Sequence, residues 1–148
     1  MNPPAKVESK KRPKSSMELY LIKLIHIDLN AKTVDHVLKQ IRKLDWSLPE
    51  IAKALESIFL KVWKIRYSNI HLVASMVSGL CRYQEEFTVW LVDALIEEIR
   101  MGLETNNFKH NQRRIAIVKY LSELYNYQLI DESLIFDTLY TILTFGHG

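Results

Sequence analysis

Proline and glycine are scarce in this chain of 148 residues, which contains four of each. Three of the prolines precede residue 15, so the rest of the sequence contains a single proline, the residue that most strongly breaks helices. Hydrophobic residues make up 48% of the chain, a share typical of a globular protein and too high for general disorder. Together these figures predict a helical body behind a short leader.

Cysteine is nearly absent. Cys81 is the only one, which excludes an intrachain disulfide and a thiolate metal cluster and favours a cytosolic or nuclear setting. Charges interrupt every apolar run before it reaches the roughly 20 residues that a membrane span needs. The N-terminus is polar and basic, without the apolar core of a secretory signal. We therefore expect a soluble protein in the cytoplasm, with shuttling to the nucleus left open.

Catalytic motifs are also absent. The chain has no glycine-rich phosphate loop, and none of its five histidines stands in an HExxH pattern. His71 and Cys81 are ten residues apart on one predicted helix, which separates them by about 15 Å along its axis. We expect both residues to be core residues, and we predict a protein that is not an enzyme and holds no metal or cofactor.

The net charge of +3 is concentrated in the leader. The first 14 residues contain five basic side chains and one acidic one, so the rest of the chain has a net charge of −1. Such a body lacks the basic face of a dedicated nucleic-acid binder. The composition of residues 1–15 predicts a flexible basic tail. Its segment 10–14, KKRPK, is either a nuclear-import signal or a solubilising leader.

Apolar residues recur at helical spacing over the remaining 16–148, which predicts one helical domain. We expect seven helices, at about 16–28, 32–44, 47–63, 68–83, 86–104, 108–127 and 131–145. In the first, Leu19, Ile22, Leu24 and Ile25 should form the apolar face, and Ser47 with Glu50 should cap the third. Short loops predict antiparallel hairpins stacked as a HEAT-like solenoid, with an up-and-down bundle as the competing topology. Apolar residues surround the last helix, which predicts that the domain continues beyond it or that it meets a partner.

The fifth predicted helix separates charge from apolar residues. Its buried stripe should consist of Val92, Leu95, Ile96, Ile99 and Leu103. Asp93, Glu97, Arg100 and Glu104 recur at the same spacing and form a ridge beside that stripe. The ridge is either a solvated face with local ion pairs or a docking surface for a basic partner. Arg42, on the second helix, is either a rim contact near this ridge or an exposed charge.

A basic cluster, His-Asn-Gln-Arg-Arg at 110–114, opens the sixth predicted helix. Arg113, Arg114 and Lys119 are candidate nucleic-acid contacts; the alternative is that they position one helix on the next. Positive charge near a helix N-terminus is unfavourable to the helix dipole. We therefore expect neighbouring carboxylates to hold the two arginines.

Four segments resemble a known family: 29–46, 70–86, 92–104 and 109–130. They are similar to the middle-of-initiation-factor-4G family, and within it to the third such domain of the scaffold proteins of nonsense-mediated mRNA decay. The likeness covers about residues 16–146 and about the first, N-terminal half of the family's domain.

This resemblance implies a fold of stacked helical hairpins, a scaffold or adaptor role in mRNA surveillance, and no catalytic activity. It also implies binding to the RNA-recognition-motif-like domain of Up-frameshift protein three, beside other surveillance factors. The family's acidic contact positions fall on Asp93, Glu97 and Glu104, and its basic one falls on Arg42. The alternative is an RNA-binding or helicase-binding helical domain of a translation-related factor.

Overall fold

The computed structural model of the protein describes residues 14–103 and 108–130, with 133, 137 and 140. Every regular element in these ranges is a helix, which confirms the all-α class. The basic tail before residue 14, Glu104, and nearly all of the predicted last helix lie outside the described residues. None of the described helices combines the length and apolarity that crossing a membrane requires.

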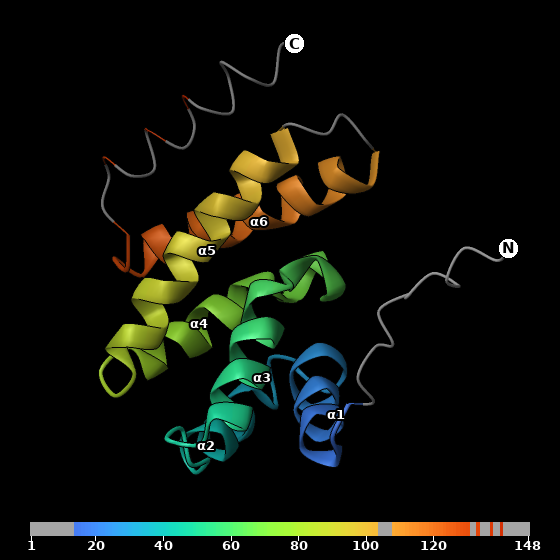
Figure 1. The fold of residues 1–148 in the computed structure, drawn as a ribbon, viewed down its shortest axis with the longest axis vertical. Helices are drawn as coiled ribbons and strands as arrows, with labels where there is room; N and C mark the ends of the chain where they lie inside the picture. Colours follow the sequence, from blue (N-terminus) through green and yellow to red (C-terminus); the bar gives the residue numbers. More distant parts are fainter. Residues whose placement is uncertain (1–13, 104–107, 131–132, 134–136, 138–139, 141–148) are drawn as a thin grey trace, which may run out of the picture.

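Six α-helices and three short helical segments follow one another along the described chain (Figure 1). The elements are α1 (Ser16–Ile22), a π-helix (Lys23–Ile27), α2 (Val34–Arg42), α3 (Pro49–Leu60), two 3₁₀ turns (Val62–Lys64 and Tyr67–Asn69), α4 (Ile70–Leu80), α5 (Glu85–Leu103) and α6 (Phe108–Asn126). The first six predicted helices are all present, with ends shifted by a few residues.

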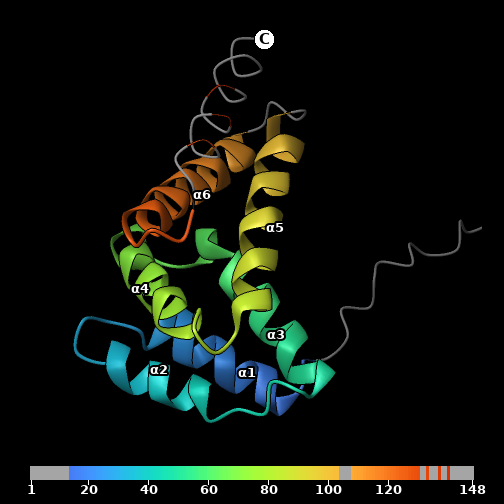
Figure 2. The ribbon, with the colours of Figure 1, turned by 90° about the vertical axis from the view of Figure 1, so that its left-hand side faces the viewer.

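The helices stack in two layers. Each helix packs against the one two places along the chain: α1 against α3 and α3 against α5 in one layer, α2 against α4 and α4 against α6 in the other. Figure 2 shows α3 and α5 on one side of the molecule and α4 and α6 on the other. This pairing is the pattern of stacked helical hairpins. It confirms the HEAT-like arrangement rather than the competing up-and-down bundle.

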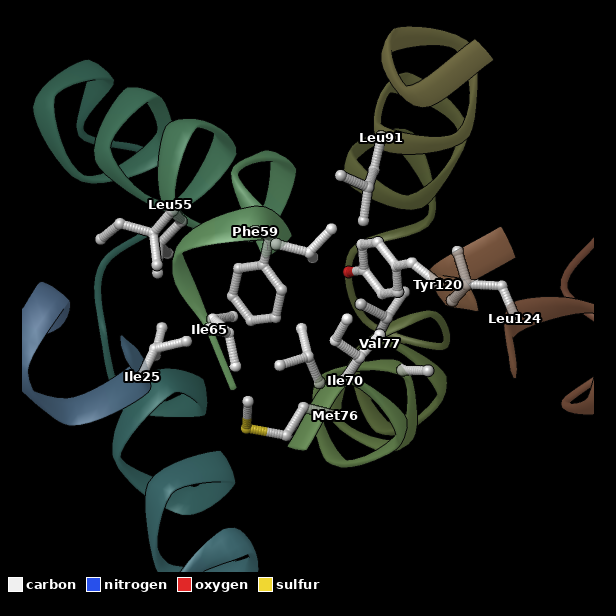
Figure 3. Packing of buried hydrophobic residues seen from close by; sticks show 14 of the residues in the cluster. Ile25, Leu55, Phe59, Ile65, Ile70, Met76, Val77, Leu91, Tyr120 and Leu124 are labelled. Atoms are coloured by element: carbon white, nitrogen blue, oxygen red, sulfur yellow. The ribbon is translucent and has the colours of Figure 1, made fainter. Parts of the chain in front are cut away.

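One continuous apolar core joins the layers. Its fully buried side chains include Leu55 and Phe59 of α3, Leu91 of α5 and Tyr120 of α6. Figure 3 shows Phe59 and Tyr120 side by side at the centre, reached by side chains of α4 and α5. Because every α-helix contributes at least one fully buried residue, no single helix is expected to hold its position alone.

Gly79 permits the close approach of α2 to α4. A Cβ atom added at this position would lie 2.7 Å from Cδ2 of Leu38, well inside van der Waals contact. The missing side chain therefore lets Leu38 rest directly on the backbone of α4. It also leaves the carbonyl of Gly79 accessible to Arg42, which is used below.

Three local predictions are wrong. The predicted apolar face of the first helix is right at Leu24 and Ile25, which are buried, and Ile22 packs against the core. It is wrong at Leu19, which is 55% exposed; Leu21, three and four residues before Leu24 and Ile25, is buried in its place. His71, expected in the core, is exposed, and Cys81 is half-buried at the C-terminal end of α4.

The predicted cap of α3 is the third error. Leu48 occupies the N-cap position and forms no side-chain cap, although Pro49 begins the helix as expected. The hydroxyl of Ser47 donates instead to Oδ1 of Asp45 at 2.5 Å, and its backbone N–H donates to the same oxygen. A local aspartate turn has thus replaced the helix cap, because Asp45 lies only two residues away.

Candidate functional site

The outer side of α5 is exposed and acidic. Asp93, Glu97 and Arg100 all face solvent, while Leu91, Leu95 and Ile99 anchor the inner side in the core. At 100° per residue the three charged positions fall within about 60° of one another. The structure thus places these three members of the ridge together, and the fourth, Glu104, lies outside the described residues.

Pairing within this ridge is weak. Arg100 Nη1 lies 4.0 Å from Glu97 Oε2, at the outer limit for an ion pair, and the two side chains are 65% and 61% exposed. Exposed pairs of this kind contribute about 0–1 kcal/mol and are screened by salt. The carboxylates of Asp93 and Glu97 therefore remain available to a cationic partner.

Two apolar side chains share the exposed side of α5, and sequence reasoning missed them. Val89 is 57% exposed and Trp90 is 36% exposed, one turn before Asp93. With Glu86 they extend the ridge toward the start of the helix. Carrying the helical periodicity back from Asp93 to Glu85 would have found them. We call the set the acidic face of α5, and it consists of Glu86, Val89, Trp90, Asp93, Glu97 and Arg100.

Arg42 is exposed, yet its guanidinium has internal partners. Nη2 donates to the carbonyl of Gly79 at 2.8 Å, and Cζ lies 5.4 Å from the ring centroid of Tyr83. Gly79 is next to the last residue of α4, where a cation interacts favourably with the helix dipole. Arg42 therefore fastens the end of α2 to the end of α4.

A surface pocket and a row of aromatic rings connect Arg42 to the acidic face. The pocket, of about 440 Å³, is lined by Arg42, Trp46, Leu80, Tyr83 and Gln84, just before α5 begins. Trp46 contacts Phe87 edge to face, with ring centroids 5.1 Å apart, and Phe87 stacks on Trp90 at 6.5 Å. Among the described contacts, none joins Arg42 directly to Asp93 or Glu97.

The candidate nucleic-acid contacts are engaged within the molecule. Arg113 Cζ lies 4.7 Å from the ring centroid of Trp63. Lys119 Nζ donates to Glu123 Oε1 at 2.7 Å and lies 5.9 Å from the ring of Tyr67. This hydrogen bond raises the pKa of Lys119 and lowers the pKa of Glu123.

For Arg113, these contacts correct the expectation of a carboxylate partner. Because α6 begins at Phe108, Arg113 and Arg114 lie in its second turn, where the dipole effect has faded. Arg113 is held by an aromatic ring rather than by a carboxylate, and Nε of Arg114 is buried. All three candidates, including Lys119, are half-buried. Their geometry favours a role in positioning one helix on the next over a role in RNA binding.

The described part of the chain shows no arrangement suited to catalysis by a metal. It contains no group of three or more His, Cys, Asp or Glu side chains close enough to hold an ion. His71 and Cys81, the one nucleophilic pair that the sequence offers, lie at opposite ends of α4.

Comparison with known proteins places these features in a family. The model of the MIF4G domain family matches residues 19–148. Regulator of nonsense transcripts 2 from Homo sapiens is 39% identical over 145 residues, which are 98% of the chain. Regulator of nonsense transcripts UPF2 from Arabidopsis thaliana is 47% identical over 94% of it, and Nonsense-mediated mRNA decay protein 2 from Saccharomyces cerevisiae is 38% identical over 84%. The chain spans 11% of the length of each of these relatives.

Proposed function

This chain belongs to the MIF4G domain family, and on that premise we propose that it is a non-catalytic scaffold module of nonsense-mediated mRNA decay. In this proposal the acidic face of α5 binds the RNA-recognition-motif-like domain of Up-frameshift protein three. The names of the relatives support the pathway, since they are regulators of nonsense transcripts and a nonsense-mediated mRNA decay protein. We further propose that the module acts in the cytoplasm, with passage to the nucleus.

The observation that carries the proposal is the two-sided character of α5. Its inner side is fixed by fully buried Leu91 and Leu95, while its outer side presents carboxylates beside Val89 and Trp90. A rigid helix can hold these groups in one arrangement before a partner arrives, which lowers the entropic cost of binding. Carboxylates select a basic partner and speed its approach, and an exposed tryptophan is a common energetic anchor.

Arg42 has a supporting part in this proposal. Its hydrogen bond to α4 and its contact with Tyr83 shape the pocket next to the start of α5. The buried ring of Phe87 contacts both Trp46, in the pocket lining, and Trp90, on the acidic face. In this proposal a partner that covers Asp93 and Trp90 also reaches the pocket beside Arg42.

A charge reversal tests the proposal. Glu97→Arg should weaken binding of the Up-frameshift three domain by about 2–5 kcal/mol in calorimetric titration, if the contact is desolvated on binding. Asp35→Arg, the same reversal at an exposed position of α2, is the matched control and should leave the affinity unchanged. Circular dichroism and thermal melting of both variants establish that the fold is intact.

The competing RNA-binding function predicts a different pattern. If RNA is the ligand, binding should fall steeply with salt and should respond to Arg113→Gln rather than to Glu97→Arg. Unchanged affinity of the Glu97→Arg variant for the protein partner, or equal loss in the Asp35→Arg control, would remove the acidic face from the mechanism. Trp90→Ala separately tests the apolar part of the face, and it should weaken the same complex.

A further inference from the structure

A second charged feature, of opposite sign, lies between α1 and α3. A cavity of about 270 Å³ opens there, beside the π-helix that continues α1. Four lysines line it: Lys14 precedes α1, Lys53 lies on α3, and Lys61 and Lys64 follow α3. Among the described residues of the lining, the one carboxylate is that of Glu18. We call this cavity the lysine pocket. In Figure 1, α1 and α3 lie at the end of the molecule away from α6.

The charges of three of these lysines act on one side chain in the wall of the pocket. His26, in its wall, donates from Nε2 to the carbonyl of Ile58 at 3.1 Å. Burial lowers the pKa of His26, and the positive charges of Lys64, Lys14 and Lys61 lower it further, in that order. Three of the four lysines thus act on the same imidazole, although they come from separate segments. An anion in the pocket would be attracted by several ammonium groups at once.

The remaining lining restricts the kind of anion. Ile22, Ala54 and Ile58 provide an apolar wall, and none of the described residues that line the pocket is aromatic. Proteins that bind single-stranded RNA rely on aromatic rings that stack on the bases, worth about 1–3 kcal/mol per base. A cavity of about 270 Å³ suits a side chain rather than a folded element. The lining therefore fits a peptide better than it fits RNA.

We propose that the lysine pocket binds a phosphorylated serine or threonine side chain of a partner peptide. A phosphomonoester carries a charge of about −1.5 to −2 and three acceptor oxygens, which match a cluster of ammonium groups. Lysine binds phosphate as a point charge and not through a planar fork as arginine does. The number of lysines therefore matters more than their orientation. The apolar wall would receive the aliphatic neighbours of the phosphorylated residue. This inference does not depend on the acidic face of α5.

Fluorescence polarisation with a labelled peptide tests the proposal. The peptide carries one phosphoserine between leucines, and its unphosphorylated form is the reference. The phosphorylated peptide should bind about tenfold more tightly or better. Lys53→Ala and Lys61→Ala should each reduce that preference. Lys39→Ala, on α2, and Lys43→Ala, directly after it, change exposed lysines, are the matched controls and should preserve it.

Glu18→Gln supplies a test in the opposite direction. Removing the one carboxylate in the lining should strengthen phosphopeptide binding several-fold, an outcome that partial unfolding cannot mimic. Equal binding of the two peptides would overturn the proposal. So would tighter binding of a single-stranded oligoribonucleotide that is lost in the same lysine variants, because the pocket would then be an RNA contact.

Discussion

The guanidinium of Arg113 lies over the indole ring of Trp63, with Cζ 4.7 Å from the ring centroid. Trp63 belongs to the 3₁₀ turn that follows α3, and Arg113 belongs to the second turn of α6. The pair therefore ties α6 to the connection between α3 and α4. A cation over a tryptophan ring contributes about 0.5–2 kcal/mol, depending on exposure. The contact of Arg113 with Trp63 thus gives this arginine a structural role.

Replacing Arg113 tests this role. Arg113→Gln should lower the free energy of unfolding by about 1 kcal/mol, because the cation is removed while most of the chain length is kept. Urea denaturation measures the change. A double-mutant cycle with Trp63→Leu isolates the pair, and it should show a coupling of about 0.5–1 kcal/mol. Additive effects of the two substitutions would contradict the contact.

Tyr120 places a polar hydroxyl in the apolar core. Its ring is fully buried, and its hydroxyl has no hydrogen-bond partner among the described residues. Burial raises the pKa of this phenol well above its ordinary range. Because a buried hydroxyl without a partner costs about 1–3 kcal/mol, Tyr120→Phe should leave stability unchanged or raise it by up to that amount. Thermal denaturation measures this, and a large loss of stability would show that the hydroxyl is satisfied after all.

Two leucines of α1 provide a matched pair for its helical register. Leu21 is fully buried, whereas Leu19 is 55% exposed. Leu21→Ala should destabilise the protein by about 2–5 kcal/mol, and Leu19→Ala by less than about 0.5 kcal/mol. Urea midpoints of the two variants decide the register. The reverse order would restore the face expected from sequence.

His26 should make stability depend on pH. Burial lowers its pKa below the ordinary value of 6.5, so the unfolded chain binds a proton more strongly than the folded protein does. Stability should therefore fall as the pH drops from 6.5 toward the lowered pKa of the folded state. Glu123 titrates below 4.5, since the hydrogen bond from Lys119 lowers its pKa, and it does not contribute in this interval.

Urea denaturation at about pH 7.5 and about pH 5.5 measures the effect of His26. His26→Gln should reduce the difference between the two conditions, because glutamine can still donate to Ile58 but does not titrate. His71→Gln is the control, as His71 is exposed. A pH difference that survives in the His26→Gln variant would assign it to another group.

Local periodicity predicted the helices well because helix formation depends on neighbours three and four residues away. The stripe of α5 shows this: Val92, Leu95 and Ile99 are buried as expected, and Ile96 packs against the core from a half-buried position. The cap of α3 failed because Ser47 had a second acceptor nearby, in Asp45. Sequence spacing shows which hydrogen-bond partners a side chain can reach, but it does not show which of them it binds.

Contacts between distant segments were beyond prediction. Arg113 and Trp63 are 50 residues apart, and nothing near Arg113 indicates an aromatic partner. The lysine pocket likewise draws on Lys14 and Lys53, which no helical period relates. The acidic face was found in part, since Asp93 and Glu97 lie on one helix. Its apolar members, Val89 and Trp90, were missed although the same period reaches them.

The amino-acid sequence by itself determined that the chain forms helices, which side of α5 is apolar, and which family it belongs to. These properties follow from short-range spacing and from residue identity. Only the tertiary structure decided that Arg42 and Arg113 hold helices together, and that four scattered lysines share one cavity. The reason is physical: a cation takes the partner that packing brings within a few ångströms, and packing is set by the whole core.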